Sequence, residues 1–227
     1  MENIRQQYED IFDKLGEHFY VKSWISEQSK VIFILESPHI EEVKYGAPVS
    51  GRSGTTMSKH LFGPEYNKPL GRLVIKNIEE QKNRPALDAV GLMNICGIPM
   101  QRKAYGDRNV TQAYQEFFDV LEGVRQGNQK DVYPNEAWNV MQEVILDRFR
   151  ERLAKQQDKK CVLVPCGRFA QKFFRLADMD SHNWKVIDGV PHPSYNSWDR
   201  ERYQPAVRQV QKAFERGREV AAEGNGS

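Results

Sequence analysis

The sequence predicts an α/β fold, a three-layer sandwich in which a short, mostly parallel four-stranded sheet lies between layers of helices. Four short apolar runs, rich in β-branched residues, alternate with longer segments whose apolar residues recur at helical spacing. These runs cover residues 31–35, 89–95, 161–165 and 185–190, and each has the length of one buried strand.

Helical patterns lie before, between and after the predicted strands. The chain opens with an amphipathic helix over about residues 2–17, whose apolar side chains share one face: Ile4, Tyr8, Ile11, Phe12 and Leu15. The other helices are expected at about 55–62, 69–82, 111–126, 136–156, 168–176 and 204–222. The last residues, about 223–227, end in Gly-Asn-Gly-Ser and should form a frayed tail.

Length and composition fit one globular domain that spans residues 1–227. The chain is 39% hydrophobic and 28% charged, and no apolar run approaches the roughly 20 residues that a membrane-spanning helix needs. The first residues lack the build of a secretory signal, so we expect a cytoplasmic protein with no membrane partner, and a monomer. The three cysteines show no metal-site spacing, which predicts buried reduced thiols, no metal and no cofactor.

Each predicted strand leads into a residue with useful chemistry. In the order of the chain these residues are Glu36, Asn94, Arg168 and His192. The carboxyl ends of parallel strands meet at one edge of a sheet, where ligands bind in such folds. Four distant segments should therefore deliver polar groups to one place.

The segment after the fourth predicted strand holds a histidine on a stiff turn. Pro191 and Pro193 fix the backbone on both sides of His192, so its imidazole is held in place. Such an imidazole can stabilise or protonate an oxyanion, and a purely structural histidine is the alternative. Ser194 is not expected to be a hydrolase nucleophile, because the chain has no Gly-x-Ser-x-Gly elbow.

A glycine-containing segment before a predicted helix suits an anion. Gly51, Arg52, Ser53 and Gly54 combine close backbone approach with the free N–H groups of a helix start, and a simple turn with a helix cap is the alternative. The nucleotide P-loop is excluded because no Gly-Lys-Ser/Thr follows. The net charge is only +2, but residues 44–76 hold six basic side chains and a single acid, which suits a phosphate-bearing partner.

Glu36 and Asn94 each have a functional and a structural interpretation. The Glu36 carboxylate can position water or stabilise a developing cation, or it can cap a nearby turn. Glu41 and Glu42 are alternative carboxylates that we expect to be solvated. Asn94 carries a donor and an acceptor on a short stem, which suits the polar edge of a base, or it can satisfy buried backbone groups.

Taken in order, these segments resemble the uracil-DNA glycosylase superfamily over most of the chain, from Val31 to about Trp198. The resemblance lies in Leu35-Glu36-Ser37-Pro38, Gly46–Gly54, Leu92–Asn94, Val162–Arg168 and His192-Pro193-Ser194. They resemble, respectively, the family's first motif, the loop that follows it in the iron–sulfur branch, the base-reading strand, the third strand with its Gly-Arg turn, and the second catalytic motif.

The resemblance implies an enzyme that flips a nucleotide out of the DNA helix and hydrolyses its N-glycosidic bond, which leaves an abasic site. His192 would then stabilise the anionic base, and Glu36 would organise water. The residues implied to bind the base are Ser37, Val49 and Asn94. Those implied to bind DNA phosphates are Gly51, Arg52, Ser53, Gly54, Arg168 and Ser194. The wedge that fills the gap left by the flipped base would be Tyr195 and Asn196.

The sequence departs from that family at several places. Ser37 stands where the uracil enzymes have an aspartate, and they have a tyrosine near the position of His39. Val49 stands where the iron–sulfur branch carries a base-stacking phenylalanine, and three scattered cysteines cannot hold that branch's cluster. The segment at about 100–156 is interpreted as a helical insertion. These departures predict a base pocket roomier than uracil needs.

The resemblance, together with these departures, implies a monofunctional DNA glycosylase. Its substrate would be uracil or a bulky modified pyrimidine in DNA, such as a hypermodified phage cytosine, and its role would be DNA repair or antiphage defence. The main alternative is a non-catalytic nucleic-acid-binding module on the same fold, because the usual aspartate is missing. A third hypothesis is a metal-dependent hydrolase built on Glu36, His39 and His192, although the spacing of these residues matches no known pattern of metal ligands.

Overall fold

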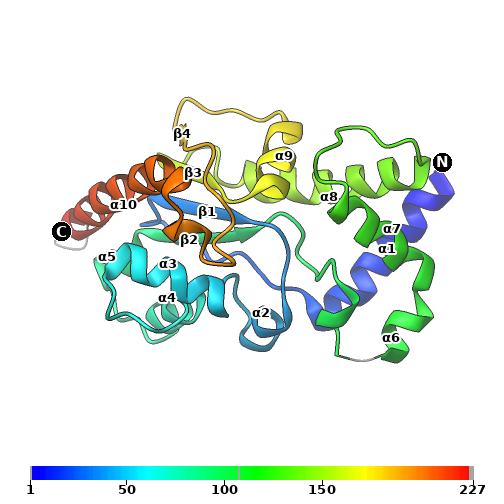
Figure 1. Ribbon diagram of the computed structural model, residues 1–227, viewed down its shortest axis with the longest axis horizontal. Coiled ribbons are helices and arrows are strands. Elements are labelled where there is room, and N and C mark those ends of the chain that lie inside the picture. The colour runs from blue at the N-terminus through cyan, green and yellow to red at the C-terminus, as the bar shows by residue number, and fades with distance from the viewer. Residues whose placement is uncertain (1, 107, 225–227) are drawn as a thin grey trace.

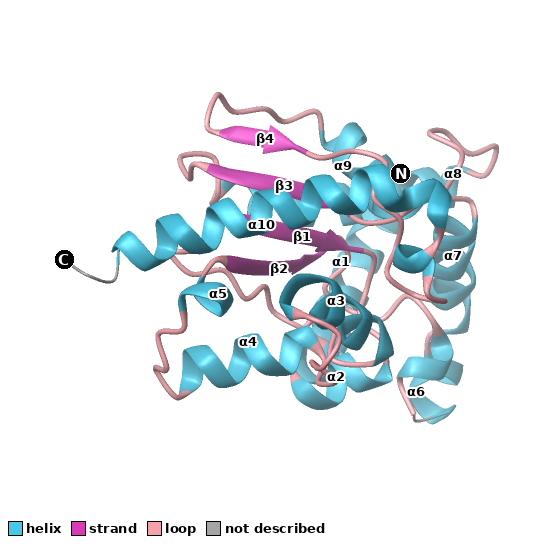
Figure 2. Ribbon diagram, turned by 60° about the vertical axis from the view of Figure 1, so that its left-hand side comes forward, coloured by secondary structure: helices cyan, strands magenta, loops and turns pink. Residues whose placement is uncertain are grey.

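A four-stranded sheet forms the centre of the molecule in the computed structural model, which describes residues 2–106 and 108–224 (Figure 1). The strands are all parallel and lie in the order β2 (Val90–Asn94), β1 (Val31–Leu35), β3 (Cys161–Pro165) and β4 (Trp184–Val186). Figure 2 shows the arrows of these strands pointing the same way, with helices in front of the sheet and behind it. The predicted α/β three-layer sandwich is confirmed.

One face of the sheet is covered by the N-terminal helix and by helices from the second half of the chain. These are α1 (Glu2–Phe19), α7 (Gln115–Gln126), α8 (Glu136–Ala154) and α9 (Arg168–Ala177), and the short α6 (Arg108–Ala113) precedes α7. Ile32 and Ile34 of β1 point into this layer, since alternate side chains of a strand face opposite sides. Fully buried aromatic rings fill the space around them: Phe118, Phe149 and Phe173.

The other face packs against α3 (Arg52–Phe62), α4 (Leu70–Glu79), α5 (Pro85–Asp88) and α10 (Gln204–Gly224), and α2 (Ile40–Tyr45) leads into this layer. Val31, Phe33 and Leu35 of β1 point into this second core. Trp198 is fully buried here, with its ring centroid 6.2 Å from that of Phe33. Burial of a side chain of this size contributes about 2–3 kcal/mol, so Trp198 ties the segment that follows His192 to the sheet.

Most predicted elements are present close to their predicted bounds. β1 and β3 have the predicted bounds, and β2 is one residue shorter at each end. The helix expected at 111–126 is divided into α6 and α7 at Tyr114. The sequence did not predict α2, α5 or the 3-10 turns η1 (Arg102–Ala104), η2 (Ser197–Asp199) and η3 (Glu201–Tyr203), because such short segments show no helical period. α10 continues to Gly224, and residues 225–227 of the expected tail lie outside the described residues.

The fourth strand differs from its prediction. The sequence predicts a buried strand at 185–190, but β4 has three residues, lies at the edge of the sheet and is partly exposed. The prediction of its length and burial is wrong. The buried apolar residues Ile187 and Val190 belong to an irregular segment that follows the strand. This segment still carries the chain to the carboxyl edge of the sheet, where His192 follows.

Candidate functional site

Three of the predicted site residues meet at the carboxyl edge of the sheet. Asn94 is the last residue of β2 and lies opposite Leu35, the last residue of β1, so Glu36 follows at the same level. The Glu36 carbonyl accepts a 3.0 Å hydrogen bond from the Cys96 N–H, which joins the two strand ends. After β3, the Gly167 N–H donates to the Val190 carbonyl at 2.9 Å and brings the His192 segment to the same edge.

Gly167 is required where the chain after β3 meets the His192 segment. Its φ is +89°, and a Cβ at this position would lie 2.8 Å from the Cβ of His192. Glycine is the residue that adopts this conformation at no steric cost and leaves room for the histidine. The Gly-Arg turn that the sequence singled out is therefore a packing feature that positions His192.

His192 is held as a neutral hydrogen-bond donor. Its Nδ1 accepts from the Ser194 backbone N–H at 3.3 Å and lies 2.9 Å from the Ser194 hydroxyl oxygen. Because a backbone N–H can only donate, Nδ1 carries no proton, and the proton of the neutral ring is on Nε2. Burial, with a smaller effect from the charge of Arg125, lowers the pKa of His192 to about 4.

The backbone around His192 is anchored on both sides. The Ser197 hydroxyl donates to the His192 carbonyl, and the indole N–H of Trp198 donates to the Pro191 carbonyl at 2.9 Å. These bonds add to the two flanking prolines that the sequence analysis identified. The imidazole therefore sits on a rigid support.

Arg125 is a site residue that sequence reasoning missed. It comes from α7, and its Nε donates to Glu36 Oε1 at 2.5 Å, with about 30% and 20% of the two side chains exposed. Burial is the largest cause of the lowered pKa values of His39 and His192, and the positive charge of Arg125 lowers both further. The segment at about 100–156 thus supplies a cation to the polar cluster, and no motif in the sequence marks this arginine among the many on its helices.

The Asn94 side chain is buried without a partner. It is 2% exposed, and within residues 2–106 and 108–224 neither its amide nitrogen nor its amide oxygen has a hydrogen-bond partner. Leaving a buried polar group unsatisfied costs about 1–3 kcal/mol. The Arg152 guanidinium holds the strand end by donating to the backbone carbonyls of Asn94 and Ile95. An unsatisfied amide on an anchored backbone is suited to a ligand with both donors and acceptors.

Glu42 is buried, which corrects the expectation of a solvated carboxylate. It is 8% exposed, and its two oxygens accept the backbone N–H of His39, at 2.7 Å, and that of Val49. Burial raises the pKa of Glu42 to about 7, against the lowering effect of the two N–H donors. Glu41 is half-buried. The role of Glu42 is to hold the turn between α2 and α3.

Gly54, in the first turn of α3, packs against Val49 in this turn. Val49 has a φ of +51°, is 3% exposed and belongs to the apolar core, which differs from the open wall of a base pocket that the sequence suggested. A Cβ on Gly54 would lie 1.7 Å from the Val49 carbonyl oxygen, so Gly54 has a packing role that the sequence did not reveal. Ser37, predicted to contact the base, is half-buried between Glu36 and Pro38.

Arg52 and Ser53, which were predicted to bind phosphate, are the first two residues of α3. Gly51 is the N-cap, and in the described part of the chain no side chain caps this helix start. Arg52 is exposed and Ser53 is half-buried. The helix also adjoins the segment after His192, because His60 Nε2 lies 2.8 Å from the Asp199 carboxylate and the His60 ring packs edge-on to Trp198. Arg52 and the free helix start therefore lie on a helix that is joined to the His192 segment.

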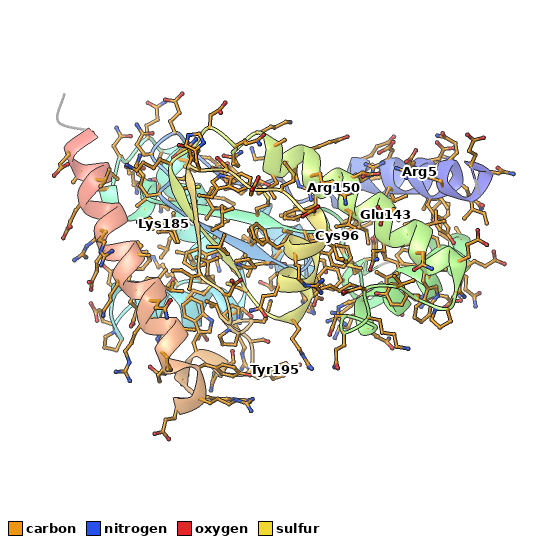
Figure 3. The ribbon with its side chains drawn as sticks, turned by 90° about the horizontal axis from the view of Figure 1, so that it is seen from above. Arg5, Cys96, Glu143, Arg150, Lys185 and Tyr195 are labelled. Atoms are coloured by element: carbon orange, nitrogen blue, oxygen red, sulfur yellow. The ribbon has the colours of Figure 1, made fainter. Side chains whose placement is uncertain are left out.

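The predicted wedge residues form an exposed tip. Tyr195 is 88% exposed, and Tyr195 and Asn196 have φ values of +54° and +51°. Non-glycine residues rarely adopt this conformation, and such strain clusters at functional sites. Figure 3 shows the Tyr195 side chain at the margin of the molecule. A large aromatic side chain is thus presented to solvent on a rigid turn.

Arg168, which was predicted to bind phosphate, lines a cleft that does not include Glu36 or His192. It begins α9 and is exposed, and the cleft, of about 600 Å³, lies next to β4. Lys172 of the same cleft is buried and donates to the Tyr133 hydroxyl at 2.7 Å, and burial lowers the pKa of Lys172 to about 8. Because Tyr133 contacts the carbonyls of Val124 and Gly127, Lys172 supports the end of α7 that carries Arg125.

Cys96, Cys161 and Cys166 are free and buried, as predicted, and burial raises the pKa values of their thiols. Among the residues that the structure describes, no group of three His, Cys, Asp or Glu side chains could hold a metal ion. None of the described helices is long and apolar enough to cross a membrane.

The chain matches no protein-family model, and a search of curated proteins found no matching sequence.

Proposed function

We propose that this chain is a monofunctional DNA glycosylase, whose substrate is uracil or a bulky modified pyrimidine. The observation that carries the proposal is the unsatisfied, buried amide of Asn94 at the same sheet edge as the neutral donor His192. A base flipped out of DNA offers a polar edge with donors and acceptors for such an amide. The resemblance of the ordered sequence segments to the uracil-DNA glycosylase superfamily supports the same proposal.

The chemistry follows from the charges of the cluster. When the bond between C1′ and the base nitrogen breaks, both electrons leave with the base, so the base becomes anionic and the sugar cationic. Nε2–H of the neutral His192 donates to the developing anion, and Arg125 supplies a positive charge nearby. Water adds at C1′ and releases a proton, and the departing base takes up a proton. Glu36, which is held by Arg125, would stabilise the sugar cation and orient the water.

The surrounding segments would hold the DNA. The exposed Tyr195, with Asn196, would fill the gap left by the flipped base, and stacking of a base on an aromatic ring contributes about 1–3 kcal/mol. Arg52 and the uncapped start of α3 would contact phosphates. We propose that the protein acts on DNA as a monomer in the cytoplasm, in DNA repair or antiphage defence.

The test is base release from a panel of defined DNAs. Duplexes and single strands that contain uracil, other deaminated bases or glucosylated cytosine are incubated with the wild type, and the free base is measured by mass spectrometry. His192→Ala should lower the single-turnover rate by about 10² or more, since it removes a donor to the developing anion. His182→Ala, an exposed histidine on the loop before β4, is the matched control and should keep the wild-type rate.

Two results would contradict the proposal. The assignment of His192 fails if a correctly folded His192→Ala variant releases base at the wild-type rate. The enzyme assignment fails if the wild type releases none of the bases while it binds DNA tightly. That second result would favour the binding module, which one observation already suits: the Glu36 carboxylate is engaged by Arg125 rather than free.

A further inference from the structure

A basic groove runs along the outer side of α4. Five of the eight residues that line this cleft of about 490 Å³ are cationic: Lys68, Arg72, Lys76, Lys82 and Arg84. We call this cleft the α4 groove. The basic side chains that the sequence places at 44–76 are therefore partly gathered here, and two further cations join them from the turn after α4.

Most of this charge is not neutralised by the protein. Glu80 pairs with Lys82 at 2.5 Å and with Lys76 at 3.7 Å. Among the residues described by the structure, no carboxylate forms an ion pair with the other three cations, Lys68, Arg72 and Arg84. Arg72 and Lys76 are like charges one helical turn apart, an arrangement that destabilises a helix. An anionic ligand would offset this repulsion.

The far wall of the α4 groove is a fixed turn. Gln81 and Asn83 have φ values of +45° and +46°, and Lys82 stands between them. The buried Asn77 holds this turn, since its side-chain oxygen accepts from the Arg84 N–H at 3.1 Å and its carbonyl accepts from the Lys82 N–H at 2.9 Å. Lys82 and Arg84 are therefore carried by a backbone anchored to the same helix as Arg72.

The α4 groove adjoins the turn between α2 and α3, which leads to Gly51 and Arg52. The Gly71 N–H donates to the Val49 carbonyl at 3.2 Å, so the first turn of α4 packs on the turn that Glu42 holds. The Arg72 guanidinium lies 4.1 Å from the ring centroid of Tyr45, the last residue of α2. Figure 2 shows α4 next to α2 and α3. Arg72 and Lys76 are spaced about 6 Å apart along the axis of α4, so the groove runs along this helix away from that turn.

We propose that the α4 groove binds the phosphodiester backbone of the DNA strand that flanks the flipped nucleotide. This inference rests on the proposed function and extends it, because it assigns a part of the substrate to a surface outside the site. A nucleic acid backbone supplies repeated negative charges, which suits a track of cations better than a single small anion would. Lys68, Arg72 and Arg84 would each contact a phosphate, and they would contribute affinity without reading sequence.

The salt dependence of DNA binding tests this inference. The triple variant Lys68→Gln, Arg72→Gln, Arg84→Gln is compared with the wild type by fluorescence anisotropy on a duplex with one abasic site, between 50 and 200 mM salt. Each lost phosphate contact should reduce the slope of log affinity against log salt by about 0.9. The variant should therefore lose about 2–3 from the slope and bind roughly tenfold or more weakly at 100 mM salt.

The matched control removes the same charge elsewhere. Lys14, Lys155 and Lys160 are exposed and lie on α1, after α8 and before β3. The variant with all three changed to Gln should keep the wild-type slope. An equal loss in both triple variants would show a non-specific effect of net charge and would overturn the inference. Thermal melting of each variant confirms that it is folded.

Two further readouts separate the possible failures. Competition with millimolar inorganic phosphate at constant ionic strength should leave DNA bound. If phosphate reduces wild-type binding to the level of the triple variant, the groove is a small-anion site and the inference is overturned.

Single-turnover base release at saturating DNA should be unchanged in the triple variant. The binding readout needs no catalysis, so a chain that binds DNA through the groove but releases no base refutes the proposed function alone. An unchanged slope in an active enzyme refutes the groove alone.

Discussion

The buried carboxyl of Glu42 should give the protein an unusual dependence of stability on pH. The change to test is Glu42→Gln, which keeps the size of the side chain and removes its titration. Burial raises the pKa of Glu42 from 4.5 to about 7, so the folded chain retains a proton that the unfolded chain releases. The free energy of unfolding at several pH values reports this difference directly.

The sign and the size follow from the two pKa values. Below pH 4.5 the carboxyl is protonated in both states. As the pH rises from 4.5 to about 7, ionisation favours the unfolded chain, and the contribution of Glu42 to stability falls by about 3 kcal/mol before it levels off. His192 acts in the opposite direction, because its pKa falls from 6.5 to about 4 on folding and stability is lost as the pH falls through that window.

The assay is urea unfolding of the wild type and of Glu42→Gln between pH 4.5 and 8. The difference between the two proteins cancels His192 and the other groups that they share. The glutamine carbonyl keeps one N–H bond, but its NH₂ meets the other N–H, so the variant should carry a constant loss of about 1–3 kcal/mol. On top of this loss, the variant should gain about 3 kcal/mol relative to the wild type as the pH rises to 7.5.

The neighbouring Glu41 provides the control. Glu41→Gln removes a half-buried carboxylate from the same helix, and Glu42 rather than Glu41 accepts the two N–H groups. Glu41→Gln therefore removes a carboxylate from this helix without removing the two N–H contacts of Glu42. A stability difference between Glu42→Gln and the wild type that stays constant from pH 4.5 to 8 would refute the reasoning, because it would mean that folding does not shift the titration of Glu42.

The remaining predictions concern the candidate site. Arg125→Gln should raise the pKa of His192 while burial keeps it below 6.5, measured by NMR titration of the ring; a fall in that pKa would contradict the assignment. Gly167→Ala should lower stability by about 1–3 kcal/mol and slow base release, since the new Cβ meets His192 in a strained backbone; unchanged melting and activity would count against it. Tyr195→Ala should weaken binding to abasic DNA by about 1–3 kcal/mol and leave the melting temperature unchanged, and equal binding would exclude the wedge. Val49→Phe should destabilise the fold by about 1–3 kcal/mol in urea unfolding, because Val49 is in the core; a variant of full stability would show that an open pocket lies there.

The sequence by itself determined the layers of this protein and the edge where its polar residues meet. Short β-branched runs and helical spacing are local patterns, so β1, β2 and β3 and the long helices could be predicted from them. The prolines around His192 restrict their own backbone, and the stiffness of that turn was therefore visible in the sequence. Asn94 could be placed at the edge because strand ends in a parallel sheet share one side.

Only the tertiary structure decided which of these residues have partners. The pairing of Arg125 with Glu36 joins positions 89 residues apart, and no local pattern distinguishes that arginine from its neighbours. The burial of Glu42 depends on the backbone of Val49, and the need for glycine at position 54 depends on how closely α3 approaches that same turn. Periodicity reports which face of an element is buried, whereas hydrogen bonds, pKa values and close contacts depend on distances between segments that meet after the chain has folded.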